Sequence, residues 1–267
     1  MIYDCFPFFN ELDLLEIRLN ILSPVVDKFV LVEASKTQSL KDKPFYFEEN
    51  KERFKPFLDK IVHVKIEEYP KSGGWAMENF QRNCIAKGLQ TVDLMANDIV
   101  AISDLDEIWN PAHAEEIKKS IFEYDFLSAG MRYLVFYLNL ETVNKKWIGT
   151  IFTRGKNLIN YNPQALRNIK DSVTEIEDAG WHFGYQGGIE KVYQKYLSCI
   201  EPVDKSLLPS LEKFSEEFSA RIKDGGSFIF SDKLEDKSIK LKRVEFDESY
   251  PEFIVKNKDK YQHLIYG

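Results

Sequence analysis

The segment Asp98-Ile-Val-Ala-Ile-Ser-Asp104-Leu-Asp106-Glu107 joins a short apolar run to three closely spaced carboxylates. The run is rich in β-branched residues, which predicts a buried strand. Charge at the end of a buried strand is costly unless a partner balances it. A hard divalent cation that also binds phosphate oxygens is such a partner. The segment therefore predicts a metal-bound phosphate at the tip of an inner strand.

The sequence on either side of this strand alternates between helix and strand patterns. Helical periodicity covers residues 11–22, 78–94, 111–124 and 189–199, and strand patterns cover residues 29–33, 61–66, 126–139 and 147–154. Residues 171–188 look irregular, and the last sixty or so residues read as a charged helical region. This order predicts a single compact α/β unit with a mixed central sheet and a helical C-terminal region.

Composition narrows the class of protein. The chain has 267 residues, of which 44% are apolar, enough for a sizeable core. The net charge of −7 argues against a nucleic acid partner, which favours a basic face. Cys5, Cys84 and Cys199 are widely spaced and odd in number, which favours reduced thiols in the core. No basic region precedes a long apolar stretch, so we expect a cytoplasmic protein that can touch the inner membrane face peripherally.

The spacing of Asp104 and Asp106 suits cation binding. On an extended backbone their side chains share a face, and a turn lets both reach one ion. A simpler interpretation is that one of them caps the following helix. Two enzyme classes use such a pair: a sugar-nucleotide transferase, in which it holds Mn²⁺ or Mg²⁺ on a diphosphate, and a haloacid-dehalogenase-like phosphatase, in which Asp104 is the nucleophile. A strand about a hundred residues into the chain suits the phosphatase poorly.

A second candidate segment is Asp178-Ala-Gly180-Trp181-His182-Phe-Gly184-Tyr185-Gln-Gly187-Gly188. Its glycines let a backbone approach a ligand closely, and Trp181 and Tyr185 offer faces on which sugar rings stack. His182 is one of only four histidines. We interpret it as a metal ligand or a phosphate contact, although a lone histidine is often only packed or exposed.

With both segments in view, the chain resembles glycosyltransferase family 17. The matching pieces are Phe29-Val-Leu-Val-Glu33-Ala-Ser, Ile102-Ser-Asp104-Leu-Asp106-Glu107-Ile, Ala179-Gly-Trp181-His182 and Asp224-Gly225-Gly226-Ser-Phe228. Their order and spacing across most of the chain make the set more specific than the acidic triplet alone.

The resemblance implies a GT-A-like, Rossmann-related single domain over residues 1–267. Residues 1–125 would form a nucleotide-sugar-binding half, and residues 126–267 an acceptor-binding half with C-terminal helices. The resemblance also implies a nucleotide-sugar donor (UDP-N-acetylglucosamine), Mn²⁺ or Mg²⁺, and inversion at the anomeric carbon. Asp104 and Asp106 would hold the metal and diphosphate, Glu33 would lie by the nucleoside, and His182 near the phosphates.

Inversion in one displacement needs a carboxylate that accepts the proton of the acceptor hydroxyl. Asp178 is the first candidate for this base, followed by Glu177 and Glu107. Asp178 and Glu177 can equally be ordinary solvated loop carboxylates.

Two residues before the acidic segment also suit a donor site. Arg82 can bind the donor phosphate or uridine, because guanidinium pairs with phosphate bidentately, or it can pair with Glu78 one helical turn away. Trp75 follows Gly73-Gly74 and can belong to a loop that closes over the donor, or to an ordinary turn.

The acceptor follows less directly from the resemblance. A glycan or glycolipid at the cell surface is the predicted acceptor, with Trp181 and Tyr185 contacting it. The alternative from another class is a carbohydrate-binding protein that keeps the fold without catalysis.

Overall fold

The computed structural model describes residues 1–143, 145–198, 209–226 and 239–267. The chain forms two compact units, one of residues 1–131 with 148–180 and one of residues 132–147 with 181–267. Strand β6 (Phe126–Val135) contributes residues to both. The division into nucleotide-sugar-binding and acceptor-binding halves at residue 125 stays a prediction.

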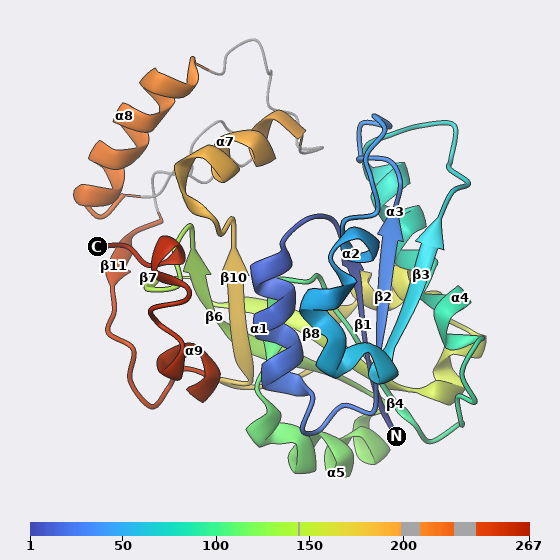
Figure 1. The fold of residues 1–267 in the computed structure, drawn as a ribbon. Coiled ribbons are helices and arrows are strands. Elements are labelled where there is room, and N and C mark those ends of the chain that lie inside the picture. The colour runs from blue at the N-terminus through green and yellow to red at the C-terminus, as the bar shows by residue number, and fades with distance from the viewer. Residues whose placement is uncertain (144, 199–208, 227–238) are drawn as a thin grey trace. The chain divides into compact units, whose positions relative to one another are not determined.

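Four parallel strands form the centre of the first unit, in the order β4-β1-β2-β3. They are β1 (Ile2–Phe8), β2 (Lys28–Ala34), β3 (Ile61–Ile66) and β4 (Ile99–Ile102). The helices between them are α1 (Leu12–Leu22), α2 (Tyr46–Glu49), the 3-10 helix Lys51–Lys60, α3 (Trp75–Asn83) and α4 (Ile85–Leu89). Figure 1 shows β2 and β3 as neighbouring arrows and the helices of this unit around them. Strand–helix alternation of this kind is what produces a parallel sheet.

Further strands make this sheet mixed. Strand β8 (Trp147–Arg154) runs antiparallel to β4 and lies next to β6, and β9 (Thr174–Ile176) runs parallel to β6. The unit also contains β5 (Glu107–Trp109), α5 (Ala114–Tyr124), α6 (Pro163–Asn168) and the 3-10 helices Pro111–His113, Gly155–Ile159 and Lys170–Ser172. The predicted α/β class with a mixed central sheet is confirmed.

The second unit contains the last part of β6 with β7 (Leu140–Thr142), β10 (Gly180–Gly184) and β11 (Leu241–Arg243). Strand β10 is parallel to β6, and β7 is antiparallel to both β6 and β11. Its helices are α7 (Gly188–Ser198), α8 (Leu211–Lys223), α9 (Glu252–Lys256) and the 3-10 helix Gln262–Leu264. Phe214, Phe218 and Ile222 on α8 pack into its core, in agreement with the expected helical C-terminal region.

Alternation along β1 divides its side chains between the two faces of the sheet. Tyr3 and Cys5 join the core formed with α3 and α4, whereas Phe6 lies under the guanidinium of Arg18 on α1. Cys84 belongs to the same core as Cys5, so the prediction of core cysteines is confirmed for both. Cys199 lies outside the described residues.

Several sequence-based boundaries were wrong. Strand β1 was not predicted, although it pairs with both β2 and β4 inside the parallel sheet. The expected helix over residues 78–94 is two shorter helices, and Gly88 in the second lies so close to β2 that a Cβ there would be 2.5 Å from Val30. The supposedly irregular residues 171–188 contain β9 and β10. Within the described ranges, no helix has both the length and the apolar surface needed to span a bilayer.

Candidate functional site

The acidic segment lies at the carboxyl end of β4. Asp104 is two residues beyond the end of this strand, and Glu107 begins β5. The strand order reverses beside it, because β2 and β3 lie on one side of β1 and β4 on the other. Open α/β sheets bind ligands beyond the carboxyl ends of their strands at such a reversal. The fold therefore puts the predicted motif at the favoured ligand position of the first unit.

Two buried arginines hold the carboxylate of Asp104. Nη2 of Arg82 donates to Oδ1 at 2.7 Å, and Nη2 of Arg167 donates to Oδ2 at 3.1 Å. The arginine side chains are 4% and 8% exposed, while that of Asp104 is 38% exposed. Asp104 thus faces solvent with its orientation fixed from within the protein.

Glu107 lies beneath this contact and is fully buried. Its Oε1 accepts a hydrogen bond from Nη2 of Arg167, and its Oε2 accepts one from the amide of Asp104 at 3.2 Å. Burial disfavours the charged guanidinium of Arg167, but the carboxylates of Glu107 and Asp104 outweigh this and raise its pKa. Because Glu107 is enclosed in this network, acting as a base would require the network to open, and that role stays a prediction.

Arg82 reaches Asp104 from α3. Its Nη2 also donates to Oε1 of Glu78 at 3.0 Å, and its Nη1 donates to Oε1 of Gln164. The ion pair with Glu78 expected from the one-turn spacing is therefore confirmed. Burial raises the pKa of Glu78, the charge of Asp104 adds to this, and Arg82 opposes it. A phosphate contact by Arg82 stays a prediction.

The buried Nε of Arg82 has no hydrogen-bond partner in the described part of the chain. An unsatisfied buried donor costs about 1–3 kcal/mol, so a water or ligand oxygen within reach would be favourable.

Trp75 begins the same helix, after Gly74 at φ 69°. Glu78 and Arg82 follow Trp75 by three and seven residues, so all three side chains lie on one face of the helix. Trp75 is 56% exposed, so an aromatic surface is open on the face of α3 that leads to Asp104. Closure of this region over a donor stays a prediction.

Glu33 lies near the end of β2 with its carboxylate fully buried. Its Oε1 accepts a hydrogen bond from the amide of Phe47 at 3.2 Å, and its Oε2 lies 3.0 Å from Nε2 of His63. Nζ of Lys43 lies 3.7 Å from Oε1. Glu33 therefore fastens the segment that follows β2, and its contact with a nucleoside stays a prediction.

His182, in the second unit, packs against two aromatic rings, Tyr133 and Trp147, whose own centroids are 5.3 Å apart. Its ring stacks on Tyr133 with centroids 4.6 Å apart and planes 8° apart, and Trp147 lies at 4.3 Å on a tilt of 33°. His182 is 6% exposed. The structure thus gives His182 a defined packing environment, and its roles as metal ligand and phosphate contact stay predictions.

Trp181 and Tyr185 flank His182 along the chain. Trp181 is buried, and its Nε1 donates to the carbonyl of Ser249 at 3.0 Å. Tyr185 has a left-handed backbone, with φ 56°, and Nζ of Lys195 lies 4.8 Å from its ring centroid. In this conformation the indole of Trp181 has little open surface for a sugar, and acceptor binding by either residue stays a prediction.

Glu177 and Asp178 lie exposed in the turn between β9 and β10. Asp178 has φ 49°, a conformation that aspartate tolerates better than most side chains, so it suits the turn itself. Gly180 follows, and a Cβ on it would lie 2.6 Å from the carbonyl oxygen of Ile108. Glycine is needed there because the chain passes close to the backbone just beyond the acidic segment. The base assignment to Asp178 or Glu177 stays a prediction.

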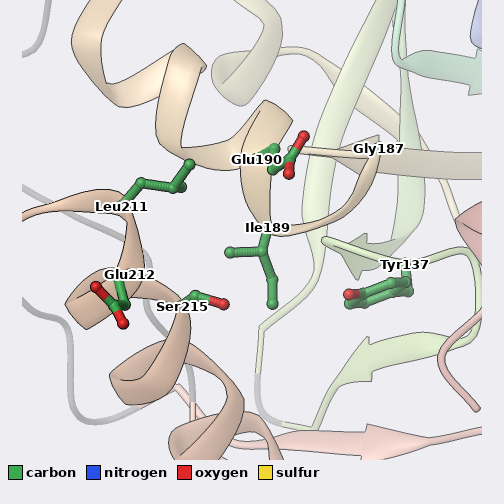
Figure 2. Close-up of a pocket in the computed structure, with 7 residues that line it drawn as sticks. All are labelled: Tyr137, Gly187, Ile189, Glu190, Leu211, Glu212 and Ser215. Carbon is green, nitrogen blue, oxygen red and sulfur yellow. The ribbon is translucent and has the colours of Figure 1, made fainter.

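A pocket of about 680 Å³ lies in the second unit. It is lined by Tyr137, Gly187, Ile189, Glu190, Leu211, Glu212 and Ser215. Figure 2 shows Ile189 between Tyr137 on one side and Glu212 and Ser215 of α8 on the other. No residue assigned a site role from the sequence lines this pocket.

The acidic segment is the predicted site for a metal ion held jointly with a ligand. Among the described residues, no group of three or more His, Cys, Asp or Glu side chains could enclose a metal ion. Mg²⁺ and similar ions are commonly bound by one or two carboxylates together with substrate phosphates. Binding of such an ion by Asp104 and Asp106 together with a diphosphate stays a prediction.

Arg167 and Arg18 were not identified from the sequence as site residues. Arg167 contacts Asp104 and Glu107 from positions 63 and 60 residues away. Arg18 contacts the carbonyl of Glu107 across 89 residues. No local pattern marks an isolated arginine for such a contact. Only the fold brings these side chains to the acidic segment.

The sequence profile of glycosyltransferase family 17 matches residues 1–194. The chain belongs to glycosyltransferase family 17. The matched region contains both the acidic segment and the Gly-Trp-His segment, so the resemblance inferred from these motifs is confirmed. Family membership also favours the transferase over the phosphatase that the acidic pair alone left open.

This family-17 chain is similar to the β-1,4-mannosyl-glycoprotein 4-β-N-acetylglucosaminyltransferases of Homo sapiens, at 26% identity, and Rattus norvegicus, at 23%. Each match extends over 221 residues and covers 71% of this chain and 41% of the relative. The chain thus spans less than half the length of these curated relatives.

Two solved structures of S. aureus TarS, residues 1–349, are also similar to the chain. The first matches with a TM-score of 0.44 at 14% identity, covering 84% of this chain and 73% of TarS. The second, a complex with UDP-GlcNAc, matches with a TM-score of 0.43 at 12% identity, covering 82% and 71%.

Proposed function

We propose that the chain is a metal-dependent, inverting glycosyltransferase that moves N-acetylglucosamine from UDP-N-acetylglucosamine to a glycan acceptor. The observation that carries this proposal is the position of Asp104. Its partly exposed carboxylate stands at the strand-order reversal of an open α/β sheet, in a chain of glycosyltransferase family 17. The names of the similar mammalian proteins support the choice of sugar and of a glycan acceptor.

Asp104 and Asp106 would hold Mn²⁺ or Mg²⁺ in this proposal. When bound, the ion would counter the negative charge that grows on the leaving diphosphate. Arg82 and Arg167 fix the direction of the Asp104 carboxylate and balance its charge before any ligand arrives. The exposed ring of Trp75, on the same face of α3 as Arg82, offers a surface for the nucleobase.

Inversion requires a carboxylate that accepts a proton from the acceptor hydroxyl as the new bond forms. Asp178 is our first candidate, with Glu177 second, because both are exposed and precede the Gly-Trp-His segment. Trp181 and Tyr185 are the proposed acceptor contacts. The acceptor would be a glycan or glycolipid, and the proposed setting is the cytoplasm, with peripheral contact to the membrane.

Calorimetry with UDP, in the presence and absence of Mn²⁺, tests the proposal. We expect binding heat that depends on Mn²⁺, and an affinity at least about tenfold lower in Asp106→Asn, because one carboxylate of the cation site loses its charge. Glu115→Gln is the control, since it removes an exposed carboxylate on α5 that pairs only with Lys118 in the described contacts.

Two results would contradict the proposal. One is UDP binding of equal strength with and without Mn²⁺, and the other is full metal-dependent affinity in Asp106→Asn. Binding of glycans without any metal-dependent nucleotide heat would instead favour the non-catalytic carbohydrate-binding protein.

A further inference from the structure

Arg18 lies in α1 with its side chain fully buried, in contact with the acidic segment. Helix α1 connects β1 to β2 and carries none of the residues proposed to touch the donor. A buried guanidinium is costly unless its charge and its five N–H donors are all satisfied. The hydrogen-bond partners of Arg18 therefore show how this cost is offset and indicate the role of the side chain.

On one side, Arg18 pairs with Asp4 of β1. Its Nε donates to Oδ2 at 2.7 Å and its Nη2 donates to Oδ1 at 2.7 Å, a two-point contact between two side chains without solvent exposure. The indole Nε1 of Trp109 also donates to Oδ1 of Asp4, at 3.3 Å. The pair balances its own charge, so the remaining donors of Arg18 can be used elsewhere.

On the other side, Arg18 holds the backbone of the acidic segment. Its Nη1 lies 3.1, 3.0 and 2.9 Å from the carbonyl oxygens of Asp104, Leu105 and Glu107. Its Nη2 donates to Oγ of Ser103 at 2.6 Å. Three carbonyl oxygens that converge on one point repel one another unless a cation lies between them. Arg18 supplies that cation and so defines the turn from which the side chains of Asp104 and Asp106 project.

We propose that Arg18 is a positioning residue for the acidic segment, which holds its backbone in the conformation that binds the metal-linked diphosphate. The part that concerns donor binding rests on the function proposed above. Lysine cannot replace it, because an ammonium has three donors from one nitrogen, whereas the guanidinium contacts Asp4, Ser103 and the carbonyl oxygens from three nitrogens in a fixed plane.

The expected loss of UDP affinity in an Arg18 variant can be estimated from other metal sites, whose ligands must be held precisely. Loss of the groups that orient metal ligands commonly lowers metal affinity about 10- to 100-fold. Arg18→Lys should therefore lower the Mn²⁺-dependent affinity for UDP by at least about tenfold. The same change should speed hydrogen exchange at the amides of Asp104 and Glu107, which are bonded to Glu107 Oε2 and to the Asp104 carbonyl.

The matched control is Arg53→Lys. Arg53 also pairs with α1, at 2.6 Å from Asp13 and 2.5 Å from Glu16, and none of these contacts among the described residues is with the acidic segment. The Arg53→Lys variant should be less stable than the wild-type protein. Its UDP affinity and its amide hydrogen exchange at Asp104 and Glu107 should be unchanged. If Arg18→Lys fails to fold, the double variant Asp4→Asn with Arg18→Met takes its place, since it leaves no unpaired buried charge.

Each outcome decides a separate point. Faster exchange together with weaker Mn²⁺-dependent UDP binding supports the proposal, provided that Arg53→Lys changes neither. Unchanged exchange at Asp104 and Glu107, or unchanged UDP affinity in a folded Arg18 variant, overturns it. If the wild-type protein shows no metal-dependent UDP binding but Arg18→Lys still speeds exchange, the proposed function fails while the positioning of the segment by Arg18 stands.

Discussion

Arg167 shows how much the acidic segment depends on single buried charges. It donates to both Asp104 and Glu107, and its Nη1 donates to the carbonyl of Gly149 at 2.9 Å. Glu107 has no solvent exposure, so removing Arg167 would leave its carboxylate buried without the guanidinium that balances its charge. Removal of one member of a buried pair is far more costly than loss of an exposed pair.

We therefore predict that Arg167→Met lowers the free energy of unfolding by about 3–5 kcal/mol. Urea or guanidinium titration measures this change. Arg154→Met is the matched control, because Arg154 pairs with an Asp125 carboxylate that is 44% exposed, and its loss should cost at most about 1 kcal/mol. Equal losses in the two variants would show that the Glu107 pair is not a major contribution to stability.

At the scale of elements, α2 is tied to its neighbours by charge. The carboxylate of Glu48 on α2 lies 2.7 Å from Lys51 in the following 3-10 helix and 2.7 Å from Lys65 on β3. Hydrogen bonds from Lys51 and Lys65 lower the pKa of Glu48 from 4.5 to about 2. A carboxyl group with a lowered pKa in the folded protein stabilises the fold at neutral pH, and this contribution disappears as the pH falls from 4.5 to about 2.

The prediction is that Glu48→Gln is less stable than the wild-type protein at neutral pH, and that the difference vanishes as the pH falls from 4.5 to about 2. The difference should be small, because solvent screens these pairs. Thermal unfolding across this pH range measures it. Glu52→Gln changes an exposed carboxylate in the adjacent 3-10 helix and serves as the control. A difference between Glu48→Gln and wild type that stays constant with pH would contradict the prediction.

At the scale of the whole molecule, donor binding should appear as a rise in melting temperature. A ligand at a hundred times its Kd adds about 2.7 kcal/mol to the stability of the state that binds it. For a chain of this size each kcal/mol corresponds to roughly 2–4 °C. We predict that a UDP sugar with Mn²⁺ raises Tm by several degrees, and that GDP and CMP sugars do not.

Each sugar nucleotide should be tested with and without Mn²⁺, and with Mn²⁺ alone as the reference. A larger shift with a GDP or CMP sugar would contradict the choice of donor base. A UDP-sugar shift of equal size without Mn²⁺ would contradict the metal dependence.

The local sequence determined much of the first unit. Alternating or continuous apolar runs identified β2, β3 and β4, and helical periodicity identified α1, because these patterns reflect which side of each element faces the core. The acidic segment was also identified locally, since its three carboxylates directly follow an apolar, β-branched run in the sequence. Strand β1 was missed because Asp4 and Pro7 interrupt its apolar pattern, and the buried charge of Asp4 is balanced by Arg18.

The sequence by itself determined the α/β class, the family and the position of the acidic segment. The class and this position depend on residues that are neighbours along the chain, and the family on the order and spacing of short motifs. Only the tertiary structure decided that Arg18, Arg82 and Arg167 meet at this segment. It also decided that Gly180 lies close to the backbone of Ile108, just after the segment. The arginine contacts join residues 22 to 89 positions apart. A buried charge is stable only when the fold supplies its partner, and no local pattern carries that information.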